Sequence, residues 1–244
     1  MLIVVNHLTR MQQGYICVAG IDLETGLHVR PVLNRQMPVD LLSVHGGAFD
    51  MARIVDLGKT KFVGRIPELE DHWFDATSAR HAGDMPSGQF WALLQRTAHD
   101  KLGAIFGPDL ERIGATCVVA EGCGLHSLGC YWASGGRLFV DHGRERRRVR
   151  FAWQAGGHLF NVPVTDIRLY GDDHVTPCDT TIRRVSEQLA AQPRVLVSVG
   201  LSRPYRKAAN DPPRHWLQIN NFHLQENPCW SLQSCRPGQG SPGE

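Results

Sequence analysis

Short apolar runs separated by glycine-rich turns constrain the fold of this 244-residue chain more than any other feature. The runs that we expect to form strands are 2–5, 15–21, 27–32, 52–57, 61–66, 116–120, 137–140, 146–153, 158–164, 166–170, 195–199 and 216–224. Many short strands with few helices are typical of small barrels or of a sandwich. The pattern therefore predicts a mainly β protein with a few helices, in the α+β class.

Two segments have the spacing of amphipathic helices. The first is 87–106, in which Phe90, Leu93 and Leu94 fall on one face. The second is 179–191, which begins after one proline and stops before another. We expect no other clear helix.

Two hairpins are expected in the first third of the chain. The runs 15–21 and 27–32 are joined by a turn that ends in Gly26, and 52–57 is joined to 61–66 around a glycine. Arg30 alternates with buried positions, so it should point outward, near Arg10 if the strands pair in order. Pro31 lacks an N–H donor, which predicts that its strand lies at an edge or ends there.

The stretch 195–224 joins two strand patterns through a connection rich in basic and aromatic side chains. The apolar phase of the second strand slips at Asn220-Asn221, which predicts a β-bulge. The opposite row, Trp216, Gln218 and Asn220, has the chemistry to stack one base and hydrogen-bond another. From this strand alone, the ordinary polar face of an antiparallel strand, with a tryptophan that covers a sheet edge, is the favoured interpretation.

Positive charge is segregated along the chain although the net charge is only +2. Two segments, 137–150 and 194–216, each carry a net charge of +4, so the remainder carries −6. Such segregation is expected of a protein that meets a polyanion with one surface. Within the first segment, Arg146, Arg148 and Arg150 alternate along one strand face and form a ladder suited to phosphates, unless they are merely solvated.

The seven cysteines are an odd number in a chain that shows no export signal, so we expect reduced thiols and a cytoplasmic protein. No apolar run has the length of about 20 residues that a membrane helix needs. Four residues invite a zinc hypothesis: Cys117, Cys123, His126 and Cys130. Their intervals lack a C-x-x-C pair, which favours ordinary strand and loop cysteines. We expect neither a metal nor a cofactor.

A short sequence repeat occurs once near the start of the chain and once in its last fifth. Leu8-Thr9-Arg10 follows one strand and Leu201-Ser202-Arg203 follows another, which hints at two related modules that each present an arginine. An acidic elbow, Glu70-Asp71, follows the second predicted hairpin. Its carboxylates have the chemistry for proton transfer or metal binding, although a solvated loop accounts for them as well.

The assembled motifs resemble a prokaryotic family described as dual-OB-domain proteins, which is linked to nucleic-acid modification. The motifs that carry the resemblance are 6–10 (NHLTR), 17–32 with its central turn, the Glu70-Asp71 elbow, 199–205 (VGLSRPY) and 216–219 (WLQI). The resemblance implies two OB-like small β-barrels and a role near nucleic acid. We expect a first barrel over 1–84, a helix and second barrel over 85–227, and a flexible tail over 228–244.

Three functions remain open at this stage, and binding of single-stranded or structured RNA or DNA is favoured. Its contact residues would be Arg10, Arg30, Arg146, Arg148, Arg150, Arg203, Tyr205, Arg206, Lys207, Arg214, Trp216 and Gln218. An enzyme acting on a nucleic acid or nucleotide is the second, with Glu70, Asp71 or His7 as acid, base or metal ligand. No motif fixes a nucleophile, so the enzyme is less favoured. An adaptor that meets a protein partner in a modification or defence system is the third.

Overall fold

The structure, a computed structural model, describes residues 1–143 and 147–235. Its strands are β1 (Leu2–Arg10), β2 (Tyr15–Asp22), β3 (His28–Val32), β4 (Met37–Pro38), β5 (Arg53–Asp56), β6 (Thr60–Phe62), β7 (Asp71–Phe74), β8 (Arg80–Asp84), β9 (Ala98–His99), β10 (Glu111–Ile113), β11 (Thr116–Ala120), β12 (Leu128–Ser134), β13 (Gly136–His142), β14 (Arg147–Ala155), β15 (His158–Pro163), β16 (Arg194–Leu201) and β17 (Arg214–His223). Its helices are α1 (Ser87–Thr97), α2 (Leu102–Phe106), α3 (Asp179–Ala190) and α4 (Leu232–Cys235), with short 3-10 turns η1 (Gln12–Gly14), η2 (Val39–Leu41), η3 (Ser43–His45) and η4 (Ile167–Leu169).

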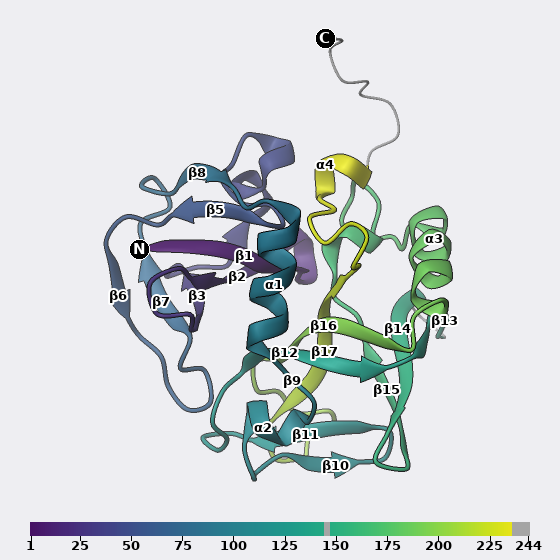
Figure 1. Cartoon of the computed structure of the whole chain (residues 1–244). Coiled ribbons are helices and arrows are strands. Elements are labelled where there is room, and N and C mark those ends of the chain that lie inside the picture. The colour runs from purple at the N-terminus through teal and green to yellow at the C-terminus, as the bar shows by residue number, and fades with distance from the viewer. Residues whose placement is uncertain (144–146, 236–244) are drawn as a thin grey trace.

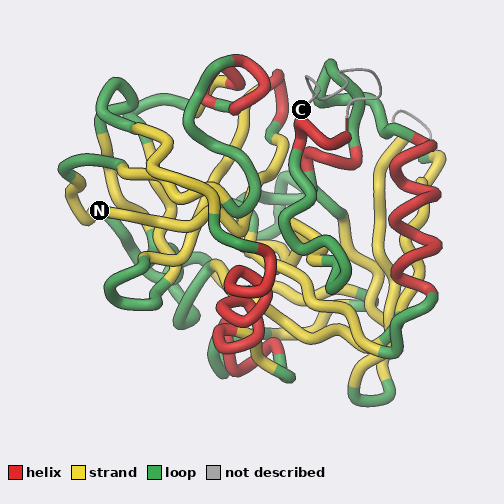
Figure 2. Tube along the Cα trace, turned by 45° about the horizontal axis from the view of Figure 1, so that its top comes forward, coloured by secondary structure: helices red, strands yellow, loops and turns green. Residues whose placement is uncertain are grey.

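The strands form two curled halves that lie side by side (Figure 1). In the first half, an eight-stranded sheet has the order β6-β7-β3-β2-β1-β5-β8, and β4 pairs with β2 beside this path. In the second half, a six-stranded sheet runs β10-β11-β17-β16-β12-β9, and a three-stranded sheet runs β13-β14-β15. Figure 2 shows strands in both halves and few helices beside them, so the mainly β prediction is confirmed.

The two halves meet where a long strand of each carries a bulge. The register of β1 against β2 shifts at Asn6, and that of β17 against β16 shifts at Asn220, so the bulge predicted there is confirmed. The next residue, Asn221, accepts a hydrogen bond from the Leu8 N–H at 2.7 Å and donates to the Leu8 carbonyl at 3.1 Å. The Asn221 side-chain amide thus makes the two hydrogen bonds that a paired backbone residue would make, and it joins β17 to β1.

Each half has its own apolar core. The first core gathers buried side chains of β1, β2, β5 and α1, and the second gathers those of β11 to β17, α2 and α3. The apolar stripe of α1, with Phe90 and Leu94 fully buried, faces the first core. The single helix expected over 87–106 is wrong, because the chain extends at Ala98-His99 to pair with β12 before α2 begins.

Two further expectations about local structure are wrong. The runs at 52–57 and 61–66 do not pair with each other, since β5 pairs with β1 and β8 while β6 pairs with β7. The strand expected over 166–170 is instead the 3-10 turn η4, which Asp166 caps by accepting a hydrogen bond from the Arg168 N–H.

Strand β3 also differs from expectation, because it is covered on both edges. It pairs with β2 through its first residues and with β7 from Arg30 to Val32, so Pro31 does not mark an edge. Arg30 is 4% exposed and points into the molecule rather than outward.

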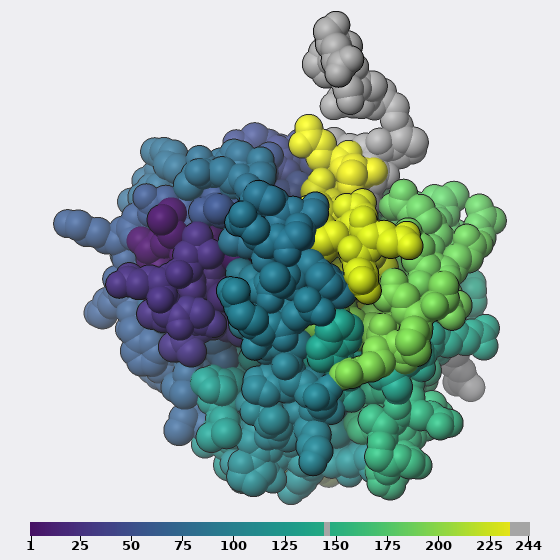
Figure 3. Space-filling model, in the orientation of Figure 1, coloured from purple at the N-terminus to yellow at the C-terminus, as the bar shows by residue number. Residues whose placement is uncertain are grey.

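The segment after β17 folds against both halves. Trp230 joins the second core and Leu232, at the start of α4, joins the first. In Figure 3 this segment, in yellow, lies on the surface between α1 and the second half. Within the tail expected from 228 onward, Trp230 and Leu232 are therefore buried, and 236–244 lie outside the described residues. Within the described ranges, no helix has the length and apolar character needed to cross a membrane.

Candidate nucleic-acid interface and barrel junction

Two aromatic rings and a lysine gather on the hairpin that extends β16 and β17. Tyr205 and Arg214 exchange backbone hydrogen bonds, which closes the connection 202–214 into a two-stranded ribbon. The rings of Tyr205 and Trp216 lie 5.9 Å apart at an angle of 35°, and the Lys207 ammonium lies 3.3 Å from the Trp216 ring centroid. Tyr205 is 46% exposed, so this pair offers a flat, cationic platform to solvent.

Arginines of β14 reach the same platform from a distant part of the sequence. Burial raises the pKa of Tyr205, and the nearby Arg148 guanidinium offsets part of that rise. Burial likewise lowers the pKa of Lys207, and Arg150 lowers it further. Arg148 is exposed, whereas Arg150 donates to the side chain and carbonyl of Asn161. Arg148 and Arg150 thus lie within electrostatic range of the platform, and we call these two arginines together with Tyr205, Lys207 and Trp216 the aromatic–basic surface.

The remaining residues predicted around this surface differ in their exposure and in the partners that their side chains already have. Arg206 is exposed and donates only to the Asp211 carbonyl among the described contacts, while Arg214 lies 3.4 Å from Glu111. Gln218 is half-buried and donates to Asn220, which is itself 4% exposed. Arg146, predicted as part of the same ladder, lies outside the described residues.

Two of the predicted phosphate contacts, Arg30 and Arg203, are engaged with carboxylates instead. Asp71 bridges them, with one oxygen 2.5 Å from Arg30 Nε and the other 2.7 Å from Arg203 Nη2. Arg203 also pairs with Glu68 at 2.8 Å. Burial would lower the pKa of Arg30, but Cys17 and Asp71 raise it on balance. We call this chain of alternating charges the junction network, because Arg203 comes from the second half and the others from the first.

Arg10 and Arg203 have separate partners. Arg10 donates to the His174 carbonyl at 2.7 Å, and its guanidinium lies 4.6 Å from the Tyr170 ring centroid. The short repeat that ends in Arg10 and in Arg203 therefore does not give the two arginines the same contacts.

Glu70 lies beside the junction network and faces a histidine. Its carboxylate accepts hydrogen bonds from the N–H and hydroxyl of Ser127, at 3.0 and 2.7 Å, and lies 3.4 Å from His126 Nδ1. Burial works to raise the pKa of Glu70, but the hydrogen bonds from His126 and Ser127 lower it overall. The same contact raises the pKa of His126, whose side chain is 52% exposed.

Behind these residues lies a buried group of polar side chains from both halves. Asn220 donates to His7 Nδ1 at 3.0 Å, and Asn6 donates to His28 Nε2 at 3.1 Å. Burial lowers the pKa of His7 well below its ordinary value and that of His28 to about 4, so both rings are neutral. Gly200 makes room here, since a Cβ at that position would lie 2.5 Å from the Asn220 amide nitrogen.

The zinc candidates are spread over separate strands and loops. Cys117 is on β11 and Cys130 on β12, and burial raises the pKa of both thiols, to about 11 for Cys117. His126 is turned toward Glu70, and Cys123 is half-buried. Among the described residues, no group of three or more His, Cys, Asp and Glu side chains is arranged to hold a metal ion.

A hollow of about 470 Å³ opens at the seam between the two halves. The first half contributes Arg65, Ile66 and Glu68, from the loop between β6 and β7. The second half contributes His215, Pro204 and the turn at 121–122. His215 and Pro204 each precede a member of the aromatic pair in the sequence, so the hollow adjoins the aromatic–basic surface.

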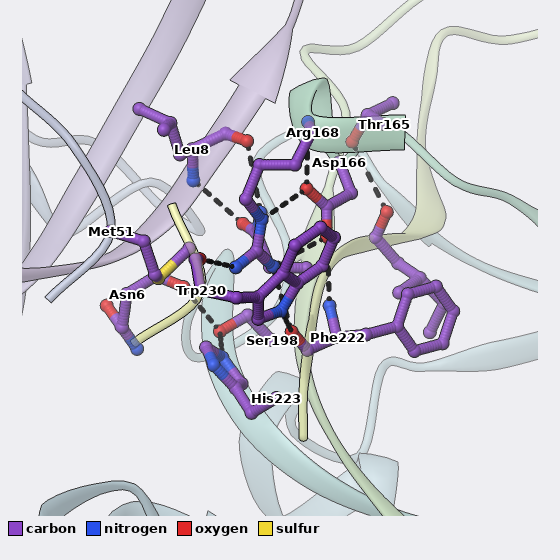
Figure 4. A network of polar contacts seen from close by, with 12 residues as sticks. Asn6, Leu8, Met51, Thr165, Asp166, Arg168, Ser198, Phe222, His223 and Trp230 are labelled. Atoms are coloured by element: carbon purple, nitrogen blue, oxygen red, sulfur yellow. Dashed lines mark hydrogen bonds and ion pairs between the residues drawn. The ribbon is translucent and has the colours of Figure 1, made fainter. Parts of the chain in front are cut away.

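Sequence reasoning missed a second buried arginine network, centred on Arg168 (Figure 4). Both Arg168 and Asp166 have fully buried side chains, and two nitrogen–oxygen contacts of 2.7 and 2.8 Å join them. Arg168 also donates to the carbonyls of Phe222 and Trp230, and the Trp230 ring lies 3.7 Å from the guanidinium carbon. The only local signal was a pair of charged residues inside an apolar run.

The comparison with family models agrees with this architecture. The family model for the dual OB-containing domain matches residues 1–222, and the expected pair of OB-like barrels is thereby confirmed. A solved structure described as a murine DNA-binding protein bound to double-stranded DNA is similar at 8% sequence identity and a TM-score of 0.33, with 95% of each chain covered. No curated protein matches the chain. The chain belongs to the dual OB-containing domain family.

Proposed function

We propose that this protein binds single-stranded or structured RNA or DNA on the aromatic–basic surface, within a system for nucleic-acid modification or defence. The observation that carries the proposal is the convergence of Tyr205, Trp216 and Lys207 with Arg148 on one surface of the second barrel. OB barrels commonly bind strands through a basic groove lined with aromatic rings, and this surface has both parts.

The physical basis of binding differs between the two kinds of side chain. A base that stacks on an exposed ring gains about 1–3 kcal/mol, whatever its sequence. Each cation that meets a phosphate releases condensed counterions, so the affinity falls as salt rises. Lys207 covers one face of Trp216, so we expect Tyr205 to present the first stacking face and Lys207 to move onto a phosphate.

The free cations define which residues contact phosphates. Arg148 and Arg206 are exposed and have no carboxylate partner among the described ion pairs, which suits them to this role. Arg30 and Arg203 serve the junction network, and a phosphate would have to displace Asp71 or Glu68 to reach them. We therefore expect the strand to run from β14 across the ribbon.

Titration of labelled single-stranded and double-stranded RNA and DNA at two salt concentrations tests the proposal. Tyr205→Ala should weaken binding of single strands about tenfold at either salt concentration, through lost stacking. Arg148→Ala should weaken binding less and lower the salt slope by about 1. Arg96→Ala, at an exposed position on α1, is the matched control and should change neither.

Two outcomes would contradict the proposal. One is a salt-independent or undetectable affinity of the wild-type protein for all four nucleic acids. The other is equal loss of binding in the Arg96→Ala control. Recovery of a bound protein without nucleic acid would instead favour the adaptor alternative.

One observation favours an enzyme as the second candidate. Glu70 has a lowered pKa and faces His126, a half-exposed side chain with a raised pKa, which is an arrangement suited to proton transfer. Asp71 is occupied by two arginines and His7 is buried, so neither matches this arrangement. Turnover of a bound nucleic acid that Glu70→Gln abolishes, with affinity unchanged, would place the enzyme first.

A further inference from the structure

One of the histidines at the seam lines the hollow and has a buried nitrogen without a hydrogen-bond partner among the described residues. His215 is 1% exposed and lines the hollow, and its Nδ1–H donates to the Ser202 carbonyl at 2.9 Å. In the neutral ring this leaves Nε2 as a hydrogen-bond acceptor. Among the described residues, Nε2 is buried and has no hydrogen-bond partner. A buried acceptor without a donor is unfavourable, so the site calls for a ligand that supplies one.

The other walls select the shape and charge of that ligand. Ile66, which is 52% exposed, and Pro204 form apolar walls suited to a flat ring. Glu68 and Glu121 add carboxylate oxygens and Arg65 adds guanidinium donors, so the hollow offers both donors and acceptors to a ligand. The volume of about 470 Å³ lies within the range of sites for small organic ligands.

The position of the hollow connects it to the bound strand. Successive residues of a strand point to opposite faces and are about 3.3 Å apart along it. His215 therefore faces the hollow while Trp216 faces the aromatic–basic surface. Pro204 lines the hollow, and the next residue, Tyr205, carries the other ring of the aromatic–basic surface. A strand that crosses the ribbon edge can thus place one base on each side.

We propose that the hollow binds one unstacked nucleobase that carries an exocyclic amino group, namely cytosine, adenine or guanine. This inference rests on the proposed function and names the subsite that gives it base selectivity. The amino N–H donates to His215 Nε2, the ring packs between Ile66 and Pro204, and Glu68 remains paired with Arg203. Uracil and thymine present a carbonyl oxygen at the corresponding place, and two acceptors would then face each other.

Nucleosides test the subsite without a strand. We expect saturation-transfer NMR to detect cytidine or adenosine about three- to tenfold more readily than uridine, the selectivity of one net hydrogen bond. Binding should also shift the nitrogen resonance of His215 Nε2. His215→Phe should remove the preference. If that buried substitution prevents folding, Ile66→Ala at an exposed wall is the second variant, and it should weaken the binding of all three nucleosides.

Homopolymers test the subsite within the strand. Wild-type protein should bind oligo-C and oligo-A about three- to tenfold more tightly than oligo-U, and His215→Phe should bring the three affinities together. Tyr205→Ala is the matched control, because it should weaken all three affinities and keep their ratio.

The two arms separate failure of the subsite from failure of the proposed function. Equal homopolymer affinities with an unchanged Nε2 resonance would overturn the subsite while nucleic-acid binding stands. Selective nucleoside binding without any oligonucleotide binding would support the subsite and overturn the proposed function.

Discussion

The molecule contains two buried arginine–aspartate networks that differ in how completely they are satisfied. In the first, the nitrogen atoms of Arg168 meet Asp166 and two backbone carbonyls, and neither residue retains an unpartnered buried side-chain atom among the described contacts. In the junction network, Arg30 pairs with Asp71, but Nη2 of Arg30 is buried without a hydrogen-bond partner among the described residues. The first network fastens the C-terminal segment, and the second lies at the seam.

The difference separates buried charges that serve the fold from buried charges that lie near a ligand. A fully satisfied pair fixes geometry and has no capacity left for another molecule. Unpartnered atoms carry a cost that the fold tolerates mainly at functional places. Among the described residues, several such atoms lie near the seam, on Asn6, His7, Arg30 and His215, and others lie on Trp153, Trp216 and His223. The seam is therefore where we place base selectivity, and the Arg168 network is where we place stability.

Replacement of Arg168 should have the largest effect. Arg168→Met removes one partner of a pair with both side chains fully buried and leaves the Asp166 carboxylate uncompensated. We expect a loss of about 3–5 kcal/mol in the free energy of unfolding, measured by chemical denaturation. Arg96→Met, on an exposed helix face, is the control and should stay within about 0.5 kcal/mol. A loss below about 1 kcal/mol would mean that this network does not fasten the fold.

Replacement of Arg30 should cost less. In Arg30→Met the Asp71 carboxylate keeps its 2.7 Å contact with Arg203, so the charge is not left unpaired. We expect a loss of about 1.5–3 kcal/mol, the range for a hydrogen bond to a charged group, in the same denaturation measurement. If Arg30→Met and Arg168→Met cost the same, the comparison between the two networks fails.

Much of the fold could be predicted because its signals are local. The change in which positions are apolar at Asn220-Asn221 indicates the bulge that brings β17 to β1. The helical periodicity of 179–191 likewise predicts α3. The break at Ala98-His99 could not be predicted, since it depends on pairing with β12, more than thirty residues later. The orientation of Arg30 could not be predicted for a similar reason. Strand β7, about forty residues later, pairs with β3 from Arg30 to Val32, and the local alternation of β3 does not reveal this pairing.

The candidate site was predicted in composition but not in grouping. Local sequence marked Tyr205, Lys207 and Trp216, and separately the arginines of β14, yet only the folded chain brings Arg148 to Tyr205. His215 gave no signal, because one histidine in an alternating strand does not reveal that its Nε2 is buried and unpartnered. Arg168 was hidden in the same way, since two of its partners lie 54 and 62 residues later in the chain.

Replacement of Arg203 should have a smaller effect that depends on salt. Its side chain is 48% exposed, so water and ions screen its pairs with Asp71 and Glu68. We expect Arg203→Ala to cost about 1 kcal/mol or less at low salt and to approach no cost at about 1 M salt. Denaturation at the two salt concentrations measures this. A cost that persists at high salt would show that Arg203 belongs with Arg168 rather than with the seam.

The smallest effect is expected at His126, and it should depend on pH. The pKa of His126 is raised above 6.5 by Glu70, so its contribution is complete below pH 6.5 and is lost as the pH rises through the raised value. The pKa of Glu70 is lowered below 4.5, so its contribution is present above pH 4.5 and is lost as the pH falls through the lowered value. The pair therefore stabilises the fold most between about pH 4.5 and pH 6.5, where His126 is charged and Glu70 is ionised.

His126→Gln tests this window at the seam. Because His126 is half-exposed, its pair with the buried Glu70 should contribute less than about 1 kcal/mol at about pH 5.5 and nothing measurable at about pH 9, if His126 has lost its proton there. Urea denaturation of both proteins at the two pH values measures the difference, with His158→Gln, at an exposed position on β15, as the control. An equal difference at both values would show that His126 acts by packing rather than by charge. In that case the enzyme alternative would lose its one supporting observation.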